Sequence, residues 1–204
     1  MIDYSLYIVT ESGLSNNRPN EKIVREAIRG GAGIVQLREK KWPKEKYFAE
    51  AMKISGICRE NNVRFVVNDY PDIAMKVKAD ALHLGQDDMS LKEARKIVGK
   101  MKIGKSTHSL QQAEAAIKEG ADYISIGPVF PTREKPNPVG TETVGKVARL
   151  NFPFVAIGGI KLHNLDSLLD AGAKTIAVIS GIVSSENIYE TTKKYVEMIR
   201  GREK

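Results

Sequence analysis

The amino-acid sequence repeats one pattern along most of its length: a short apolar run rich in β-branched residues, then a longer stretch with helical spacing. The short runs lie at Leu6–Thr10, Gly33–Leu37, Arg64–Asn68, Ala81–Leu84, Met101–Ser106, Tyr123–Val129, Phe154–Gly158 and Thr175–Ser180. Several are apolar almost throughout, which is typical of strands that are covered on both faces. Because strands that alternate with helices pair in parallel through right-handed crossovers, the pattern predicts an α/β fold.

The stretches between the runs place apolar residues on one face of a helix. Such stripes are formed by Phe48, Ala51, Met52 and Ser55; by Leu91, Ala94 and Val98; by Leu110, Ala113 and Ile117; by Leu165, Leu168 and Leu169; and by Ile188, Thr192, Tyr195 and Ile199. Ser90 with Glu93 and Ser109 with Gln112 have the spacing of helix capping boxes. Glycines at 30, 31, 120 and 172 mark helix ends. Eight strand–helix repeats in 204 residues predict a single (β/α)8 TIM barrel over residues 1–204, with an open doubly wound sheet as the less favoured alternative.

Composition narrows the class of protein and of partner. Cys58 is the only cysteine, which excludes an intrachain disulfide. No apolar run approaches the roughly 18 residues of a membrane span, and no basic region precedes an apolar stretch at the N-terminus. We therefore expect a cytoplasmic protein that contacts no membrane. The net charge of +7 favours anionic partners. Because the lysine-rich segments lack interleaved aromatic residues, we expect phosphorylated small molecules rather than nucleic acid, and we leave a homodimer open.

Unusual polar residues cluster at the C-terminal ends of the predicted strands, which in a barrel form one mouth where active sites lie. Gln36, Arg38 and Lys40 follow a period of two and so share one face of an extended chain. An arginine fork beside a lysine point charge suits a polyphosphate, whereas the alternative is a solvated strand end. Asp69 and Asp88 are hard oxygen ligands at adjacent strand ends, where Mg2+ is often held together with substrate phosphates. The alternative for each is an acid at a helix N-terminus.

Two glycine-containing turns follow the last two predicted strands. Gly158-Gly159 and Ser180-Gly181 occupy the usual phosphate-binding position of such barrels, where backbone N–H groups approach the anion. The irregular segment Phe130–Gly140 contains three prolines, and a loop of this length is more often functional than not. His108 follows the fifth predicted strand and is a candidate acid or base, whereas no His/Cys cluster has the spacing of a zinc site.

Seven segments, in this order, resemble the thiamine-phosphate synthase family from Leu6 to about Ser185. They are QLREK (Gln36–Lys40), VNDYPDIA (Val67–Ala74), DALHLGQDDM (Asp80–Met89), GKSTHS (Gly104–Ser109), ADYISIGPVFPTREK (Ala121–Lys135), VAIGGI (Val155–Ile160) and AVISGI (Ala177–Ile182). The resemblance implies a barrel enzyme that condenses hydroxymethylpyrimidine diphosphate with hydroxyethylthiazole phosphate, giving thiamine phosphate and pyrophosphate.

The resemblance also implies roles for individual residues. It assigns the pyrimidine diphosphate to Gln36, Arg38, Lys40, Asn68, Ser106 and Lys135, the magnesium ion to Asp69 and Asp88, and the thiazole phosphate to Thr132, Gly159, Ile179 and Ser180. Within the first set, Arg38, Lys40 and Lys135 are expected to stabilise the leaving diphosphate as the catalytic cations.

One position departs from the family, and two alternatives remain open. The long loop of the family usually reads Thr-x-Thr-Lys, but here Glu134 replaces the second hydroxyl, and we expect its carboxylate to turn away from the site. The first alternative is a thiazole tautomerase paralogue that uses His108 for proton transfer. The second is a non-catalytic binder of phosphorylated ligands.

Overall fold

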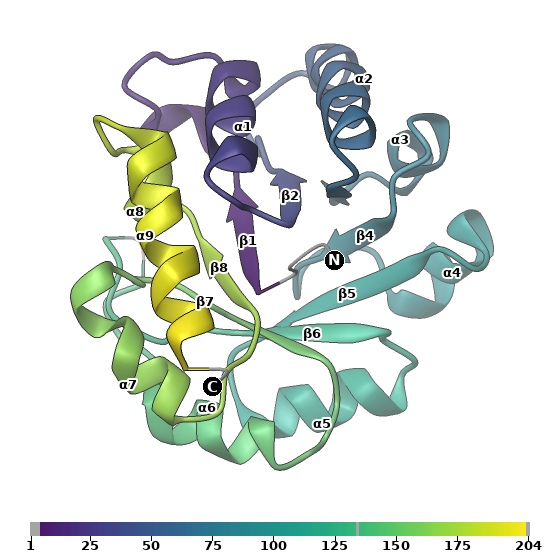
Figure 1. The fold of residues 1–204 in the computed structure, drawn as a ribbon. Helices are drawn as coiled ribbons and strands as arrows, with labels where there is room; N and C mark the ends of the chain where they lie inside the picture. Colours follow the sequence, from purple (N-terminus) through teal and green to yellow (C-terminus); the bar gives the residue numbers. More distant parts are fainter. Residues whose placement is uncertain (1–4, 134, 203–204) are drawn as a thin grey trace.

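A computed structural model describes residues 5–133 and 135–202 of the chain (Figure 1). Eight parallel strands close into one barrel in sequence order, and β8 returns to pair with β1. The strands are β1 (Leu6–Val9), β2 (Ile34–Leu37), β3 (Arg64–Asn68), β4 (Ala81–Leu84), β5 (Lys102–Thr107), β6 (Tyr123–Ile126), β7 (Phe154–Ile157) and β8 (Ile176–Val178). The predicted (β/α)8 barrel is therefore confirmed, and the open sheet is excluded because both of its edges are paired.

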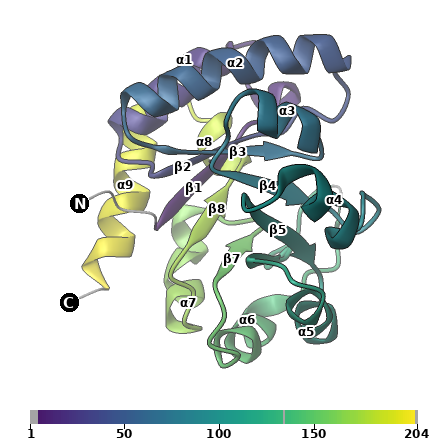
Figure 2. The ribbon, with the colours of Figure 1, turned by 90° about the vertical axis from the view of Figure 1, so that its right-hand side faces the viewer.

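Helices surround the strands in two views at right angles (Figures 1 and 2). They are α1 (Asn20–Arg29), α2 (Lys44–Glu60), α3 (Pro71–Lys76), α4 (Leu91–Val98), α5 (Leu110–Lys118), α6 (Gly140–Ala148), α7 (Leu165–Asp170), α8 (Ser180–Val183) and α9 (Ile188–Gly201), with short 3-10 turns η1 (Ser12–Leu14) and η2 (Leu162–Asn164). Helix α9 lies beside α1, so the last helix closes the ring against the first (Figure 2). Among the described residues, none of these helices combines the length and the apolar character that crossing a membrane requires.

The strands bury side chains on both of their faces. A large apolar cluster joins the strands to the helices, and a small one fills the inside of the barrel. The small cluster consists of Tyr7, Val9, Val66, Ala81, Val155 and Ala177, with Ile34 packed against it. Gln36 and Asn68 follow Ile34 and Val66 by two residues, so they point into the same barrel one layer higher, at its C-terminal end.

Helix caps follow the sequence signals closely, with one difference. Ser90 and Glu93 form the expected reciprocal capping box at the start of α4. The Ser109 hydroxyl accepts a 3.1 Å hydrogen bond from the Gln112 backbone N–H, as expected. However, the Gln112 side chain accepts from the backbone N–H of His108 rather than of Ser109, at 2.8 Å. The cap of α5 therefore also holds His108 in place at the mouth of the barrel.

One residue of the predicted apolar stripe on helix α2, Met52, is exposed rather than buried. Ala51 and Ser55 are buried as expected, but the Met52 side chain is 52% exposed. The helix is turned so that Tyr47 and Ile54 are buried, and the Tyr47 hydroxyl donates a 2.5 Å hydrogen bond to the Leu37 carbonyl. This anchor to β2 fixes the buried face, and Met52 lies about 100° away from the neighbouring Ala51 around the helix axis.

Candidate active site

A cavity of about 1180 Å3 opens at the mouth of the barrel, where the strands end. Its wall includes the predicted site residues Gln36, Arg38, Asn68, Ser106, Thr132, Lys135, Gly159, Ile179 and Ser180. Lys40, Asp69 and Asp88 do not line this cavity but form a separate group next to it. The structure thus brings the predicted residues to one end of the barrel in two adjacent groups, while their individual roles stay predictions.

The carboxylates of Asp69 and Asp88 hydrogen-bond each other beyond the ends of β3 and β4. Asp69 has a left-handed φ of 64°, and its Oδ2 lies 3.5 Å from the Lys40 Nζ. Asp88 Oδ2 accepts a 2.6 Å hydrogen bond from the Gly85 backbone N–H. Burial, reinforced by Asp88, raises the pKa of Asp69 to about 7. The adjacent negative charge of Asp88 thus adds to the cost of ionising Asp69.

This carboxylate pair fits a divalent cation. Asp69 Oδ1 is buried and has no hydrogen-bond partner, which leaves a hard oxygen with unused bonding capacity. Across the described residues, no group of three or more His, Cys, Asp and Glu side chains is arranged to hold a metal. Mg2+ commonly takes one or two carboxylates and completes its shell with water and substrate phosphates. The donor set present here is thus the kind that holds Mg2+ jointly with a phosphorylated substrate.

A lysine that the sequence analysis did not single out, Lys105, binds the loop that carries Asp88. Lys105 is buried in β5, and its Nζ donates a 2.6 Å hydrogen bond to the Gly85 carbonyl. Gly85 is the residue whose N–H binds Asp88. A lysine inside an otherwise buried strand is itself a signal, since lysine is almost never fully buried without a partner.

Arg38 and Lys135, the two predicted catalytic cations that line the cavity, both have protein partners. Arg38 Nη1 lies 2.5 Å from the Glu11 carboxylate, which orients the guanidinium. Lys135 Nζ donates a 3.2 Å hydrogen bond to His108 Nε2. His108 Nδ1 lies 2.5 Å from the Gly127 carbonyl, so we assign the neutral imidazole with its proton on Nδ1. In this arrangement His108 positions the Lys135 ammonium.

A hydrogen-bonded polar chain forms the floor of the cavity. His83 contacts the Tyr123 hydroxyl at 3.1 Å through Nδ1 and the Ser106 hydroxyl at 3.0 Å through Nε2. The Tyr7 hydroxyl bonds that of Tyr123 and accepts a 2.7 Å hydrogen bond from Gln36. Desolvation lowers the pKa of His83 to about 4, so its ring is neutral at physiological pH. Two predicted substrate contacts, Gln36 and Ser106, are thereby held by the two ends of one buried network.

Another part of the cavity wall contains the turn Gly158-Gly159 and Ser180, the predicted phosphate-binding residues that we call the phosphate cradle. Gly158 and Gly159 have φ of 100° and 68°, and a Cβ on Gly159 would lie only 2.6 Å from the Phe130 carbonyl oxygen. Only glycine fits that close approach. Lys161 Nζ donates a 3.0 Å hydrogen bond to the Ser180 hydroxyl, which places an ammonium group in the cradle. Sequence reasoning missed Lys161, and its signal was a lysine two residues after the double glycine.

The long loop after β6 contributes Thr132 and Lys135 to the cavity wall. Thr132 Oγ1 accepts a 3.0 Å hydrogen bond from the Lys135 backbone N–H, which holds these two residues together. The expectation that Glu134 turns away from the site concerns a residue outside those that the structure describes.

The family follows from comparison with known proteins. A family model for thiamine monophosphate synthase matches residues 6–182. The chain belongs to the thiamine monophosphate synthase family. Thiamine-phosphate synthase from Halalkalibacterium halodurans is 42% identical over 99% of this chain and 98% of its own length. That from Dictyoglomus turgidum is 41% identical over 98% of this chain and 92% of its own.

Solved structures agree with this family assignment. Thiamine phosphate pyrophosphorylase from Pyrococcus furiosus superposes with a TM-score of 0.91 at 34% identity, covering 98% of this chain and 96% of that one. A tryptophan synthase alpha-subunit from the same organism has a TM-score of 0.73 at 15% identity, which shows the shared barrel alone. The comparisons favour the synthase family over the tautomerase and the non-catalytic binder.

Proposed function

We propose that this enzyme condenses hydroxymethylpyrimidine diphosphate with hydroxyethylthiazole phosphate, giving thiamine phosphate and pyrophosphate. The observation that supports the proposal is that two groups of predicted anion-binding residues lie at one barrel mouth. The first group contains the carboxylate pair and Lys40, with Arg38 and Lys135 on the cavity wall, and the second contains the glycine turn and Ser180. Two phosphorylated substrates, one bound at each group with its reacting end between them, would explain why both groups are present. Since the reaction consumes phosphorylated metabolites, we place the enzyme in the cytoplasm.

In the proposed reaction, the bond from the pyrimidine methylene carbon to the diphosphate oxygen breaks, and that carbon then bonds to the thiazole nitrogen. The electron pair of the broken bond leaves with pyrophosphate, and the pyrimidine amino group stabilises the cation that remains. Arg38, Lys40 and Lys135 stabilise the charge that develops on the leaving oxygens. The reaction needs no protein nucleophile. In this proposal the hydrogen bond between His83 and Ser106 holds a substrate-binding hydroxyl in place.

Magnesium is part of this proposal. Asp69 and Asp88 would hold the ion, which when bound supplies positive charge to the leaving diphosphate. The buried, unpartnered Asp69 Oδ1 supports this assignment. The protein itself orients the substrates: Gln36, Asn68 and Ser106 would bind the pyrimidine diphosphate, and the buried floor network fixes two of these side chains. Thr132, Gly159, Ile179 and Ser180 would bind the thiazole phosphate. Holding both substrates in reacting geometry supplies much of the rate enhancement.

The direct test measures pyrophosphate release by the purified enzyme with both substrates and Mg2+, together with thiamine phosphate formation. We expect the two products in equal amounts, and neither when one substrate is omitted. Activity that persists in EDTA at saturating substrates would contradict the metal assignment while leaving the reaction intact. Release of pyrophosphate without thiamine phosphate would contradict the condensation itself.

A further inference from the structure

Lys161 occupies an unusual position for a lysine. It follows the glycine turn after β7, lines the main cavity with Gly159 and Ser180, and is only partly exposed. Its ammonium donates to the neutral Ser180 hydroxyl at 3.0 Å. Among the described residues, no carboxylate lies within ion-pair distance of its Nζ. Desolvation lowers the pKa of Lys161, which shows that the surroundings do not compensate its charge.

Hydrogen bonds fix the backbone of the loop that carries Lys161. The Lys161 backbone N–H donates a 2.8 Å hydrogen bond to Asn164 Oδ1. Asn164 Nδ2 in turn donates a 3.0 Å hydrogen bond to the Gly159 carbonyl. The glycine turn, Lys161 and Asn164 therefore form one clamped unit, and its side chain reaches across to the start of α8 at Ser180.

Charge balance identifies what this ammonium lacks. The residues expected to hold the thiazole phosphate are Thr132, Gly159, Ile179 and Ser180, and none of them carries a charge. A phosphate monoester carries a charge of about −1.5 to −2 at neutral pH. Other cations also line the cavity, namely Arg38, Lys41, Arg133 and Lys135, and Lys135 is bound to His108. Lys161 differs from them because its ammonium is hydrogen-bonded to Ser180, one of the residues expected to hold the phosphate, and has no anionic partner among the described residues.

We propose that Lys161 binds the monophosphate group of the second substrate and selects the phosphorylated thiazole over its free alcohol. The hydrogen bond to Ser180 keeps the ammonium beside the cradle, so that the phosphate meets Nζ, the hydroxyl and the glycine turn together. An ammonium that is already desolvated binds an anion with little further loss of hydration. This inference rests on the proposed function, since it names the residue that recognises one of its two substrates.

The experiment compares Lys161→Met and Lys161→Arg with Lys174→Met as a matched control. Lys174 is exposed just before β8, at the opposite end of the same strand from Ser180, so its loss changes the net charge equally. We expect Lys161→Met to raise the KM for thiazole phosphate at least tenfold, which corresponds to about 1.4 kcal/mol. The KM for the pyrimidine diphosphate should stay within about twofold, as should both values in Lys174→Met. Lys161→Arg should restore most of the affinity because it restores the charge.

Direct binding separates this inference from the reaction. Titration calorimetry with inorganic phosphate and with the thiazole alcohol needs no turnover: Lys161→Met should weaken phosphate binding about tenfold and leave alcohol binding unchanged. Equal increases of both KM values, an unchanged KM for thiazole phosphate, or equal loss of alcohol and phosphate binding would each overturn the role of Lys161. If the wild-type enzyme makes no thiamine phosphate, the proposed function fails, whereas the phosphate titration still decides whether Lys161 binds the anion.

Discussion

At the end of the barrel where the strands begin, Asp80 and Asp122 use the same arrangement twice. Asp80 accepts a 2.9 Å hydrogen bond from the Phe65 backbone N–H in β3 and lies 2.6 Å from Arg64. Asp122 accepts a 2.9 Å hydrogen bond from the Ile103 N–H in β5 and binds Arg95 at 2.6 Å. Each carboxylate therefore binds a strand backbone N–H and an arginine, and both oxygens of each have a protein partner.

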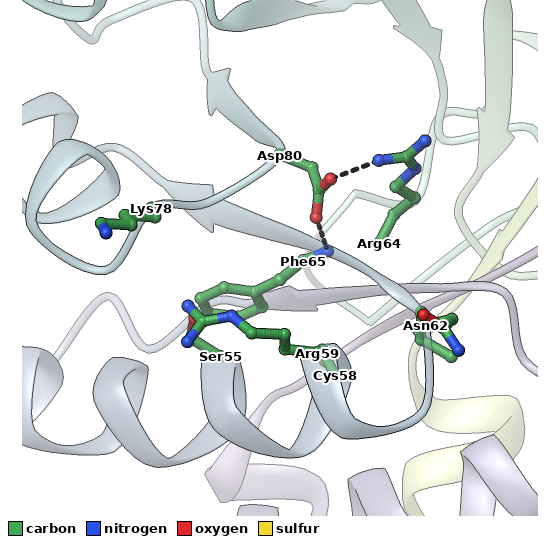
Figure 3. A pocket seen from close by; sticks show the side chains of 9 residues that line it. Ser55, Cys58, Arg59, Asn62, Arg64, Phe65, Lys78 and Asp80 are labelled. Carbon is green, nitrogen blue, oxygen red and sulfur yellow. Dashed lines mark hydrogen bonds and ion pairs between the residues drawn. The ribbon is translucent and has the colours of Figure 1, made fainter.

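A hollow at this end of the barrel likewise has a carboxylate at its edge that is bound by protein groups. It measures about 310 Å3 and lies between the C-terminal half of α2 and the start of β3 (Figure 3). Asp80, at its edge, is directed to Arg64 and to the Phe65 backbone rather than into the hollow. Burial and Asp80 raise the pKa of the Cys58 thiol to about 12, so this cysteine is not a nucleophile at neutral pH.

At the mouth of the barrel, by contrast, charged groups are close together but incompletely paired. Asp69 has a buried oxygen without a hydrogen bond, and Lys161 is bound only to a hydroxyl. Such groups cost stability and persist where a ligand completes their bonding. The difference teaches that pairing, rather than charge or cavity alone, separates the functional end of this barrel from the structural one.

The largest expected effect comes from removing a charge at the mouth. Asp69→Asn and Asp88→Asn should each lower kcat by at least about 100-fold, because the Mg2+ that we propose they hold would supply several kcal/mol of charge stabilisation. Asn tolerates the left-handed backbone at Asp69, so the change isolates the charge. Neither variant should lower the melting temperature, since each removes one of two adjacent, partly buried carboxylates. A melting temperature that falls together with kcat would show that these carboxylates stabilise the fold rather than bind a ligand.

Lys135 and His108 sharpen the comparison within the mouth. Lys135→Ala should lower kcat by about 100-fold, the lower end of the range for one donor aimed at developing charge. His108→Ala should cost less than tenfold, because the condensation needs no general base and only the orientation of the Lys135 ammonium is lost. Steady-state kinetics with both substrates compares the two. A loss for His108→Ala as large as that for Lys135→Ala would favour proton transfer by His108.

At the structural end the expected effect is on stability. Asp122→Ala should lower the free energy of unfolding by about 1–3 kcal/mol, because it leaves the Ile103 N–H and Arg95 without their acceptor. Urea unfolding measures this loss, and kcat and KM should not change. Burial opposes ionisation of Asp122, but hydrogen bonds from Arg95 and the Ile103 N–H outweigh it and lower the pKa of Asp122.

The sign of that shift predicts how the loss depends on pH. A carboxyl with a lowered folded-state pKa contributes stability above its unfolded pKa and loses it as the pH falls through the folded pKa. The wild type and Asp122→Ala should therefore differ most near neutral pH and converge in acid. A difference that grows toward low pH would show that the ion pair is not its origin.

The smallest expected effect comes from the cations beside the hollow. Arg59→Ala and Lys78→Ala remove two positive charges that line it, yet both kinetic constants should stay within about twofold and stability within about 0.5 kcal/mol. Lys161→Met, which removes the same charge at the mouth, is the natural comparison. A strong kinetic effect of either surface change would reveal a functional role for this end that the pairing of Asp80 does not indicate.

The sequence alone determined the order and type of the elements. Hydrophobic periodicity and capping signals are local, so they predicted strands such as Arg64–Asn68 and the capping box at Ser90 from the sequence alone. Because the C-terminal ends of parallel strands must meet, they also predicted which polar residues share the mouth. Met52 shows the limit, since the anchoring of Tyr47 to β2, and not the spacing, decides which face of α2 is buried.

Only the closed barrel decided the partners of individual side chains. Gln36 and Tyr7, His83 and Ser106, and Lys161 and Ser180 are separated by 29, 23 and 19 residues, and no local pattern relates them. Their contacts depend on strand register and on the tilt that closes the sheet, which are properties of the whole fold. For the same reason the sequence does not distinguish Asp80 from Asp69, since both are aspartates at strand ends. Only the tertiary structure gives Asp80 its hydrogen bonds and leaves one oxygen of Asp69 without a partner.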